Sequence, residues 1–113
     1  MSQTEGTRAG EFLLSEGNGA ISRESVTLIS GQDLVAGTVL GKITASGKYT
    51  AYSDVASNGS EVAAAILYDK VDASAGDKAA TVIARDAEVS SGLLTGSDAN
   101  GVADLAAVGI IVR

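Results

Sequence analysis

The stretch AGTVLGKITASGKYTAYS, Ala36 to Ser53, decides how the whole chain is interpreted. Its glycines and lysine invite comparison with a phosphate-binding loop, which has four residues between its glycines, then Lys, then Ser or Thr. Here three residues separate Gly37 from Gly41, and Lys42 is followed by Ile43. No helix pattern follows to supply the amide groups that would hold a phosphate. We therefore predict a tight turn at Gly37 and a close strand approach or bulge at Gly41.

The remainder of this stretch predicts a β-hairpin. The segments Thr38–Ala45 and Lys48–Ser53 read as strands, and Ser46-Gly47 between them is a turn signal. The same pattern extends along most of the chain. Further strands are predicted at Ser25–Ser30, Val62–Asp72 and Lys78–Val89, with turns at Gly31–Gly37, Ser57–Ser60 and Ala73–Asp77.

The C-terminal part changes period. In SDANGVADLAAVG the apolar residues recur at helical spacing, at Val102, Leu105, Ala106 and Val108. Ser97 or Asp98 is suited to cap the start of this helix, and Gly109 to end it. Gly101 weakens the helix, so we expect a short one. The closing IIVR, Ile110–Arg113, is predicted to be a final strand.

The N-terminal part predicts an arm. Residues 1–11 are small, polar and Gly-containing, a composition that is disordered when isolated. The first apolar cluster follows directly, with Phe12, Leu13 and Leu14. An apolar triplet behind a polar tail indicates docking, either on another protein or on the chain's own domain.

Composition excludes several classes of protein. The chain has no Cys and no His, so disulfides, thiolate chemistry and a Ser-His-Asp triad are excluded, and the usual zinc ligands are missing. Fourteen acidic against eight basic residues give a formal charge of -6, which disfavours nucleic acid and suits a protein partner. No apolar run approaches the roughly 20 residues of a membrane span, and MSQTEGTRAGE lacks the apolar centre of a signal peptide. We expect a protein made in the cytosol.

The apolar residues predict a thin core. They make up 45% of the chain, but aromatic residues only 4%, and most are Ala, Val, Leu and Ile. Burying one Val or Leu contributes about 1.5–3 kcal/mol, and an Ala much less. Such a core favours support from neighbouring subunits.

Acidic residues are the remaining candidates for chemistry. Asp69 and Asp72 flank one strand end, and Asp86 and Glu88 another, but a catalytic pair needs two environments within one cleft. The segment SDANGVAD lacks the ligand spacing and the closing Glu of a calcium loop, and helix capping explains Asp98. We predict no catalytic residue, no metal and no cofactor.

The three tyrosines do not form a platform for stacking bases. Tyr49 and Tyr52 are three positions apart in one strand, so they face opposite sides. Tyr68 lies in an apolar run and is predicted to be in the core or an interface.

In their order and spacing, four segments together resemble the head decoration protein family of lambda-like tailed phages. They are LLSEGNGAISRESVTL, SGQDLVAGTVLGKITASGKYTAYS, AAAILYDKVDASAGDKAATVIARDAEV and LAAVGIIVR. The resemblance covers roughly Phe12 to Arg113.

This resemblance implies a mainly β fold: a small β-clip-like domain at 21–113, with one short C-terminal helix and an extended N-terminal arm at 1–20. It implies a homotrimer on the outer surface of the virion capsid, bound to the major capsid protein, that cements the expanded head against packaged DNA. The arm residues likeliest to add a strand to the shell are Glu11, Phe12, Leu13, Leu14 and Ser15. Neither nucleic acid nor membrane is an implied partner.

Two other functions remain open at this stage. A small β-clip-like binding module for a small molecule or a surface glycan would need a concave site with convergent polar groups, and few aromatics are present to line one. An enzyme would have to use carboxylates, Lys or Tyr, and no motif groups these residues.

Overall fold

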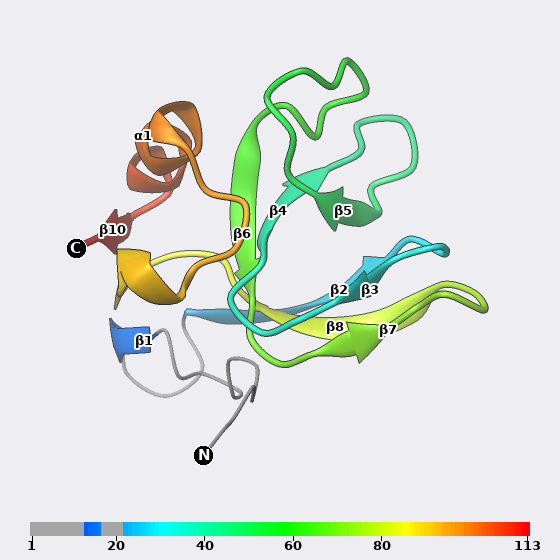
Figure 1. Cartoon of the computed structure of the whole chain (residues 1–113), viewed down its shortest axis with the longest axis horizontal. Helices are drawn as coiled ribbons and strands as arrows, with labels where there is room; N and C mark the ends of the chain where they lie inside the picture. Colours follow the sequence, from blue (N-terminus) through cyan, green and yellow to red (C-terminus); the bar gives the residue numbers. More distant parts are fainter. Residues whose placement is uncertain (1–12, 17–21) are drawn as a thin grey trace.

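The computed structural model describes residues 13–16 and 22–113. Most of the regular elements are β-strands, and one short α-helix lies near the C-terminus (Figure 1). The predicted fold class, mainly β with one short C-terminal helix, is confirmed. In chain order the elements are β1 (Leu13–Glu16), β2 (Arg23–Leu28), β3 (Asp33–Leu34), β4 (Val39–Lys42), β5 (Tyr49–Ala51), β6 (Ala63–Leu67), β7 (Val71–Asp72), β8 (Lys78–Ile83), β9 (Ala87–Val89), the 3-10 turn η1 (Ser91–Leu93), α1 (Ala99–Ala107) and β10 (Ile110–Val112).

Five strands close into a small barrel in the order β2-β5-β4-β6-β8. Strand β4 pairs antiparallel with β5 and β6, and β8 pairs antiparallel with β6 and β2. The ring closes where β2 meets β5, at a single register pair of Leu28 with Tyr49. There the Ile29 amide donates to the Tyr49 carbonyl oxygen at 2.9 Å. We call this place the seam, because few main-chain hydrogen bonds join the two strands.

Two smaller sheets are attached to the barrel. A three-stranded sheet has the order β1-β9-β10, and β3 pairs with β7 in a two-stranded ribbon. In the first sheet β9 is central: β10 runs parallel to it and β1 antiparallel. Figure 1 shows β1, β10 and α1 on one side of the barrel, with the β7–β8 turn on the opposite side.

Strands β4 and β6 have buried side chains on both of their faces. One set of buried side chains includes Leu28, Leu40 and Val82 of β2, β4 and β8, with the partly buried Tyr49 of β5 packed against it; we call it the barrel core. The other lies between the barrel, α1 and the three-stranded sheet, and includes Ile66, Ile83, Leu105 and Ile110; we call it the outer core. Neighbouring residues therefore enter different cores, as Leu40 and Val39 do. Burial on both faces explains why AAAIL of β6 reads as a continuous apolar run rather than an alternating one.

The long strands predicted at Val62–Asp72 and Lys78–Val89 are each two strands. The first breaks between β6 and β7, where Asp69 Oδ1 accepts a 2.8 Å hydrogen bond from the Lys70 amide. The second breaks between β8 and β9 at Asp86, which has a positive φ of 51°. Each break moves the chain out of the barrel into a different sheet. The turn predicted at Gly31–Gly37 likewise contains a short strand, β3.

The helix follows its predicted signals. Asp98 is the N-cap, and its Oδ1 accepts a 2.7 Å hydrogen bond from the Gly101 amide. Beyond the helix, Gly109 has a φ of 88°. Leu105 is fully buried in the outer core. A second carboxylate, Asp104, accepts at Oδ2 from the Ala63 amide at 3.0 Å and so fastens α1 to the start of β6.

Candidate functional site

The structure describes only some of the residues predicted to form the capsid-binding arm. Glu11 and Phe12 lie outside the described residues. Leu13, Leu14 and Ser15 belong to β1, which pairs with β9 of the same chain. Leu13 is partly buried and packs against the outer core. The isolated chain thus shows that this segment forms a strand; its contact with another protein stays a prediction.

The pairing of β1 with β9 is irregular. Leu13 lies opposite Val89 and Ser15 opposite Glu88, so the register shifts between these two positions. A bulge of this kind increases the local twist of an edge strand. Strand β1 is the last strand of its sheet, so its outer edge pairs with no strand in the described part of the chain. That edge offers main-chain donors and acceptors to an added strand.

Sequence reasoning missed β9 as the partner of this segment. The sequence pattern predicts one continuous strand over Lys78–Val89, whereas the structure has β8 and β9 there as separate strands. The Arg85-Asp86 pair could have indicated the end of the first strand, because these two charged residues interrupt the apolar run directly before Ala87.

The glycines of the opening stretch are structural, as predicted. Gly37 has a φ of 89°, in the region that favours glycine. At Gly41 the β4–β6 register shifts, and a Cβ there would lie 2.5 Å from the Cα of Ser60. Lys42 ends β4, and the chain continues into a hairpin whose Gly47 has a φ of 75°. The predicted turn and close approach are confirmed.

The acidic residues considered for chemistry are held by the fold. Glu88 forms an ion pair with Arg113 at 3.1 Å, and Asp72 Oδ1 accepts from the hydroxyl of Ser74 at 2.6 Å. Asp98 and Asp104 accept main-chain hydrogen bonds from Gly101 and Ala63, as described above. Among residues 13–16 and 22–113, no three acidic side chains gather where they could bind a metal ion.

The tyrosines divide between the two cores. Tyr49 packs against the barrel core and Tyr52 is buried in the outer core, which confirms that they face opposite sides. Burial and the hydrogen bond to Asp98 raise the pKa of Tyr52 to about 12. Tyr68 is partly buried against the outer core, and the guanidinium of Arg23 stacks 4.3 Å from the centre of its ring.

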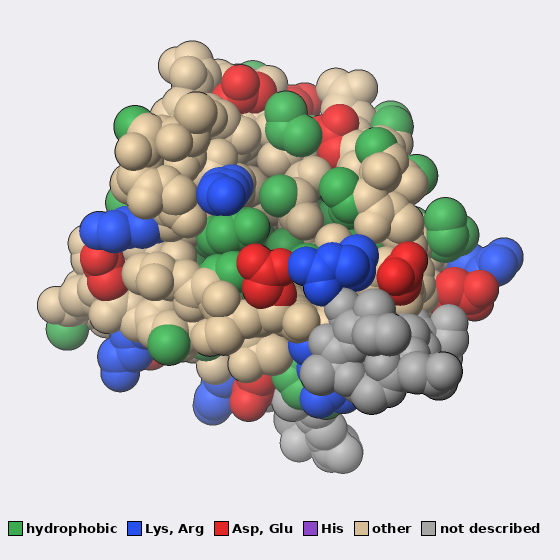
Figure 2. Space-filling view, turned by 180° about the vertical axis from the view of Figure 1, so that it is seen from behind, with side chains coloured by type: hydrophobic (Ala, Val, Ile, Leu, Met, Phe, Trp, Pro, Cys, Tyr) green, Lys and Arg blue, Asp and Glu red, His purple; other side chains and the backbone are tan. Residues whose placement is uncertain are grey.

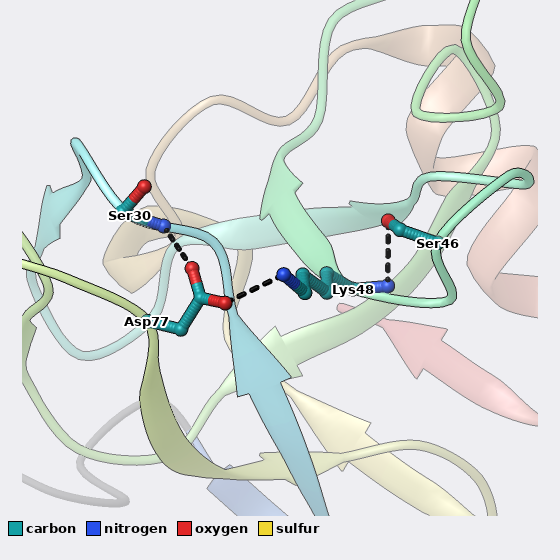
Figure 3. Close-up of polar contacts among 4 residues, drawn as sticks. All are labelled: Ser30, Ser46, Lys48 and Asp77. Atoms are coloured by element: carbon teal, nitrogen blue, oxygen red, sulfur yellow. Dashed lines mark hydrogen bonds and ion pairs between the residues drawn. The ribbon is translucent and has the colours of Figure 1, made fainter.

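A polar cluster fastens the seam of the barrel (Figure 3). The Asp77 carboxylate accepts from the Ser30 amide at 2.8 Å and forms a 2.6 Å ion pair with Lys48. The Lys48 amide in turn donates to the Ser46 hydroxyl at 3.2 Å. Ser30 follows β2, Lys48 precedes β5 and Asp77 precedes β8, so one carboxylate joins the ends of three strands. The hydrogen bond from Lys48, followed by that from Ser30, lowers the pKa of Asp77.

The closed barrel, its attached three-stranded sheet and its short helix define a small β-barrel protein. The chain belongs to the family described as bacteriophage lambda head decoration protein D, whose model matches residues 2–110, or 109 of the 113 residues. It is therefore a phage head decoration protein, a structural component of the virion capsid and not an enzyme. A search of curated proteins found none that matches the chain. No helix in the described part of the chain is long and apolar enough to cross a membrane.

Proposed function

We propose that this protein binds the outer surface of the expanded phage head as a homotrimer and stabilises the shell against packaged DNA. The observation that carries the proposal is the family match, which extends over nearly the whole chain. The partner is the major capsid protein, and synthesis takes place in the host cytoplasm before the protein joins the head.

The N-terminal arm, residues 1–20, makes the contact with the shell. Its segment Glu11–Ser15 overlaps β1, which lies at the end of the three-stranded sheet. A strand of the shell that adds to the outer edge of β1 would gain main-chain hydrogen bonds with little demand on sequence. In this arrangement β1 keeps β9 as its neighbour on the inner side.

Trimerisation compensates for weak binding by each arm. Ordering an arm of about ten residues costs roughly 1–2 kcal/mol per residue in backbone entropy, which offsets much of the contact energy. When three arms belong to one particle, the later attachments are intramolecular, and avidity rises by roughly 10²–10⁴.

Co-sedimentation with expanded and unexpanded heads tests this function. Wild-type protein should pellet with expanded heads. Ser15→Pro removes a main-chain donor from β1 and should lose most of this binding, whereas Ser15→Ala keeps the donor and should bind normally. Deletion of residues 1–16 should also abolish binding, with circular dichroism to confirm that the barrel is folded. If both Ser15→Pro and the deletion bound expanded heads normally, the arm would not be the contact with the shell. If the wild type did not bind expanded heads, the proposed function would be wrong.

A further inference from the structure

Every asparagine in the chain is followed by a glycine. The pairs are Asn18-Gly19, Asn58-Gly59 and Asn100-Gly101. In such a pair the glycine amide nitrogen can attack the side-chain carbonyl of the asparagine, because glycine has no Cβ to hinder the approach. The attack closes a succinimide ring and makes asparagine a thermolabile residue. Asn18 lies outside the described residues, so the structure compares the other two pairs.

The fold requires a glycine after Asn58. Gly59 has a φ of 111°, in the region that favours glycine. A Cβ at this position would lie 2.6 Å from the carbonyl oxygen of Lys42 and would also collide with the hydroxyl of Thr44. The Asn58 carbonyl oxygen accepts a 2.9 Å hydrogen bond from the Thr44 amide. The pair is therefore fixed in one place, against the end of β4 and the turn that follows it.

The amide nitrogen of Gly59 is bonded to a carboxylate. It donates a 2.8 Å hydrogen bond to Oε1 of Glu61. A carboxylate within hydrogen-bond reach can take the proton of an attacking group and so act as a general base. Glu61 is thus placed to receive the Gly59 proton as the nitrogen attacks.

The side-chain carbonyl of Asn58 is bonded at its oxygen by two donors. Its Oδ1 accepts from the Ser60 hydroxyl at 2.6 Å and from the Ser60 amide at 3.1 Å. Attack at Cγ would turn this oxygen into an oxyanion, and donors already in place stabilise the charge as it develops. Ser60 is only 2% exposed, so packing holds both donors in position.

The pair Asn100-Gly101 lacks this arrangement. Asn100 belongs to α1, where the helical repeat directs the Gly101 amide along the helix axis and away from the Asn100 side chain. The Gly101 amide also meets a carboxylate, Oδ1 of Asp98 at 2.7 Å. However, the side-chain oxygen of Asn100 accepts no hydrogen bond from the residues that the structure describes.

Water has access to Asn58. The residue is exposed, in the long loop between β5 and β6. Figure 1 shows this loop at the top of the molecule, and Figure 2 shows the same end from behind, with acidic side chains and no Lys or Arg at the top of the view. Water is therefore the nucleophile available to open a ring formed there.

We propose that Asn58 is a site of self-catalysed deamidation, promoted by Glu61 and Ser60. The Gly59 nitrogen bonds to Cγ of Asn58 while its proton passes to Glu61. The tetrahedral intermediate expels the side-chain nitrogen as ammonia, which takes that proton from Glu61. Water then opens the succinimide at either carbonyl and leaves aspartate or isoaspartate at position 58. The net reaction consumes water and releases ammonia, and needs no other reagent.

Conversion changes the loop in two ways. The new carboxylate at position 58 lies close to that of Glu61, so like charges oppose each other. Isoaspartate also adds a carbon atom to the main chain, at a place where Gly59 fits closely against Lys42 and Thr44. The loop therefore loses its fit against the end of β4.

Peptide mapping by mass spectrometry tests the proposal, because it measures conversion at each asparagine separately. Folded wild-type protein, kept at neutral pH, should convert Asn58 at least about tenfold faster than Asn100. It should also convert Asn58 faster than the same protein unfolded in urea. In urea both pairs lie in an unfolded chain, and their rates should be similar.

Variants separate the contributions of the two neighbours. Glu61→Gln keeps an acceptor for the Gly59 amide but removes the base, and should slow conversion of Asn58 at least about tenfold. Ser60→Ala removes the hydroxyl donor and should slow it by a similar factor or more. Glu88→Gln is the matched control: the same substitution at a carboxylate that pairs with Arg113, and it should convert Asn58 like the wild type. Circular dichroism confirms that each variant is folded.

Two results would overturn the proposal. One is slower conversion of Asn58 in the folded protein than in urea, since the loop would then protect the pair. The other is equal conversion of Asn58 in wild type and in folded Glu61→Gln, since the carboxylate would then take no part. Neither measurement uses phage heads, so the outcome is independent of the proposed function.

Discussion

The hydroxyl of Tyr52 donates a 2.9 Å hydrogen bond to Oδ1 of Asp98, 46 residues further along the chain. The same oxygen atom accepts the Gly101 amide at 2.7 Å, so one carboxylate caps α1 and holds a buried tyrosine of the outer core. The helix is thereby joined to the chain that leaves β5. Its position does not depend on the packing of Leu105 alone.

Gly101→Ala should destabilise the protein although alanine favours helices. The substitution gains about 1 kcal/mol of helix propensity. However, the new Cβ would lie 3.1 Å from Cε2 of Tyr52, whose ring is buried and held by Asp98. Overpacking of this kind costs typically about 1–3 kcal/mol, so we expect a net loss of roughly 1 kcal/mol in urea unfolding. Asn100→Ala, at an exposed position of the same helix, should be neutral or slightly stabilising. A Gly101→Ala protein more stable than wild type would show that Tyr52 can move.

Tyr52 should ionise only at high pH, and its ionisation should then lower the free energy of unfolding. Its pKa is about 12 in the folded protein, above the ordinary value of 10.0. A raised tyrosine pKa means that the folded state holds its proton more tightly than the unfolded state. The resulting stability is fully present below pH 10 and is lost as pH rises from 10 through 12. Burial and the nearby Glu24 carboxylate also raise the pKa of Tyr49, so ultraviolet absorbance of tyrosinate should show raised titrations for both tyrosines in the wild type. Tyr52→Phe should lose the titration near pH 12 and keep that of Tyr49. If Tyr52→Phe kept the titration near pH 12, the assignment would be wrong.

Gly41→Ala should cost far more stability than an ordinary surface substitution. A Cβ at Gly41 would lie 2.5 Å from Cα and 2.6 Å from the carbonyl oxygen of Ser60. Because both atoms belong to the main chain, β4 or the loop before β6 must move. We expect a loss of about 3 kcal/mol or more in unfolding free energy. Gly76→Ala is the control, since no atom lies within 4 Å of its Cβ position and it should change stability by less than about 0.5 kcal/mol. Equal stability of the two variants would contradict the close approach.

Local signals in the sequence predicted the local structure. Capping of α1 by Asp98, the turn at Gly37 and the opposite faces of Tyr49 and Tyr52 each depend on residues within a few positions of one another. A side-chain hydrogen bond to a helix amide determines the cap, backbone sterics determine the turn, and the period of a strand determines which way the two tyrosines face. These predictions were confirmed for that reason.

Long-range pairing left no comparable signal. The barrel closes through Leu28 and Tyr49, 21 residues apart, and neither residue differs in kind from other apolar strand residues. The ends of the strands before β7 and β9 were not predicted, because apolar residues follow one another there without the alternation of apolar and polar residues that marks a strand's length. The pairing of β1 with β9 likewise joins positions more than 70 residues apart, such as Leu13 and Val89. Such contacts depend on tertiary packing between segments that are far apart in the sequence. No short segment read alone shows which distant strand it pairs with.

The seam of the barrel should open when Asp77 is changed. Asp77→Ala removes both the acceptor of the Ser30 amide and the partner of Lys48, whereas Asp77→Asn keeps an acceptor and removes only the charge. Hydrogen exchange at the Ile29 amide, which bonds to Tyr49 across the seam, should therefore accelerate several-fold in Asp77→Ala and less in Asp77→Asn. Asp69→Asn, at an exposed turn between β6 and β7, should leave this amide unchanged.

The same carboxylate should make the barrel sensitive to acid. Hydrogen bonds from Lys48 and Ser30 lower the pKa of Asp77 below its ordinary value of 3.8. A lowered pKa contributes stability that is present above pH 3.8 and is lost as pH falls through the folded-state pKa. Asp77→Asn should therefore lose less stability than wild type between about pH 4 and acid unfolding, although it is less stable at neutral pH. If both proteins lost stability in parallel over that range, the cluster at the seam would not be the group that titrates.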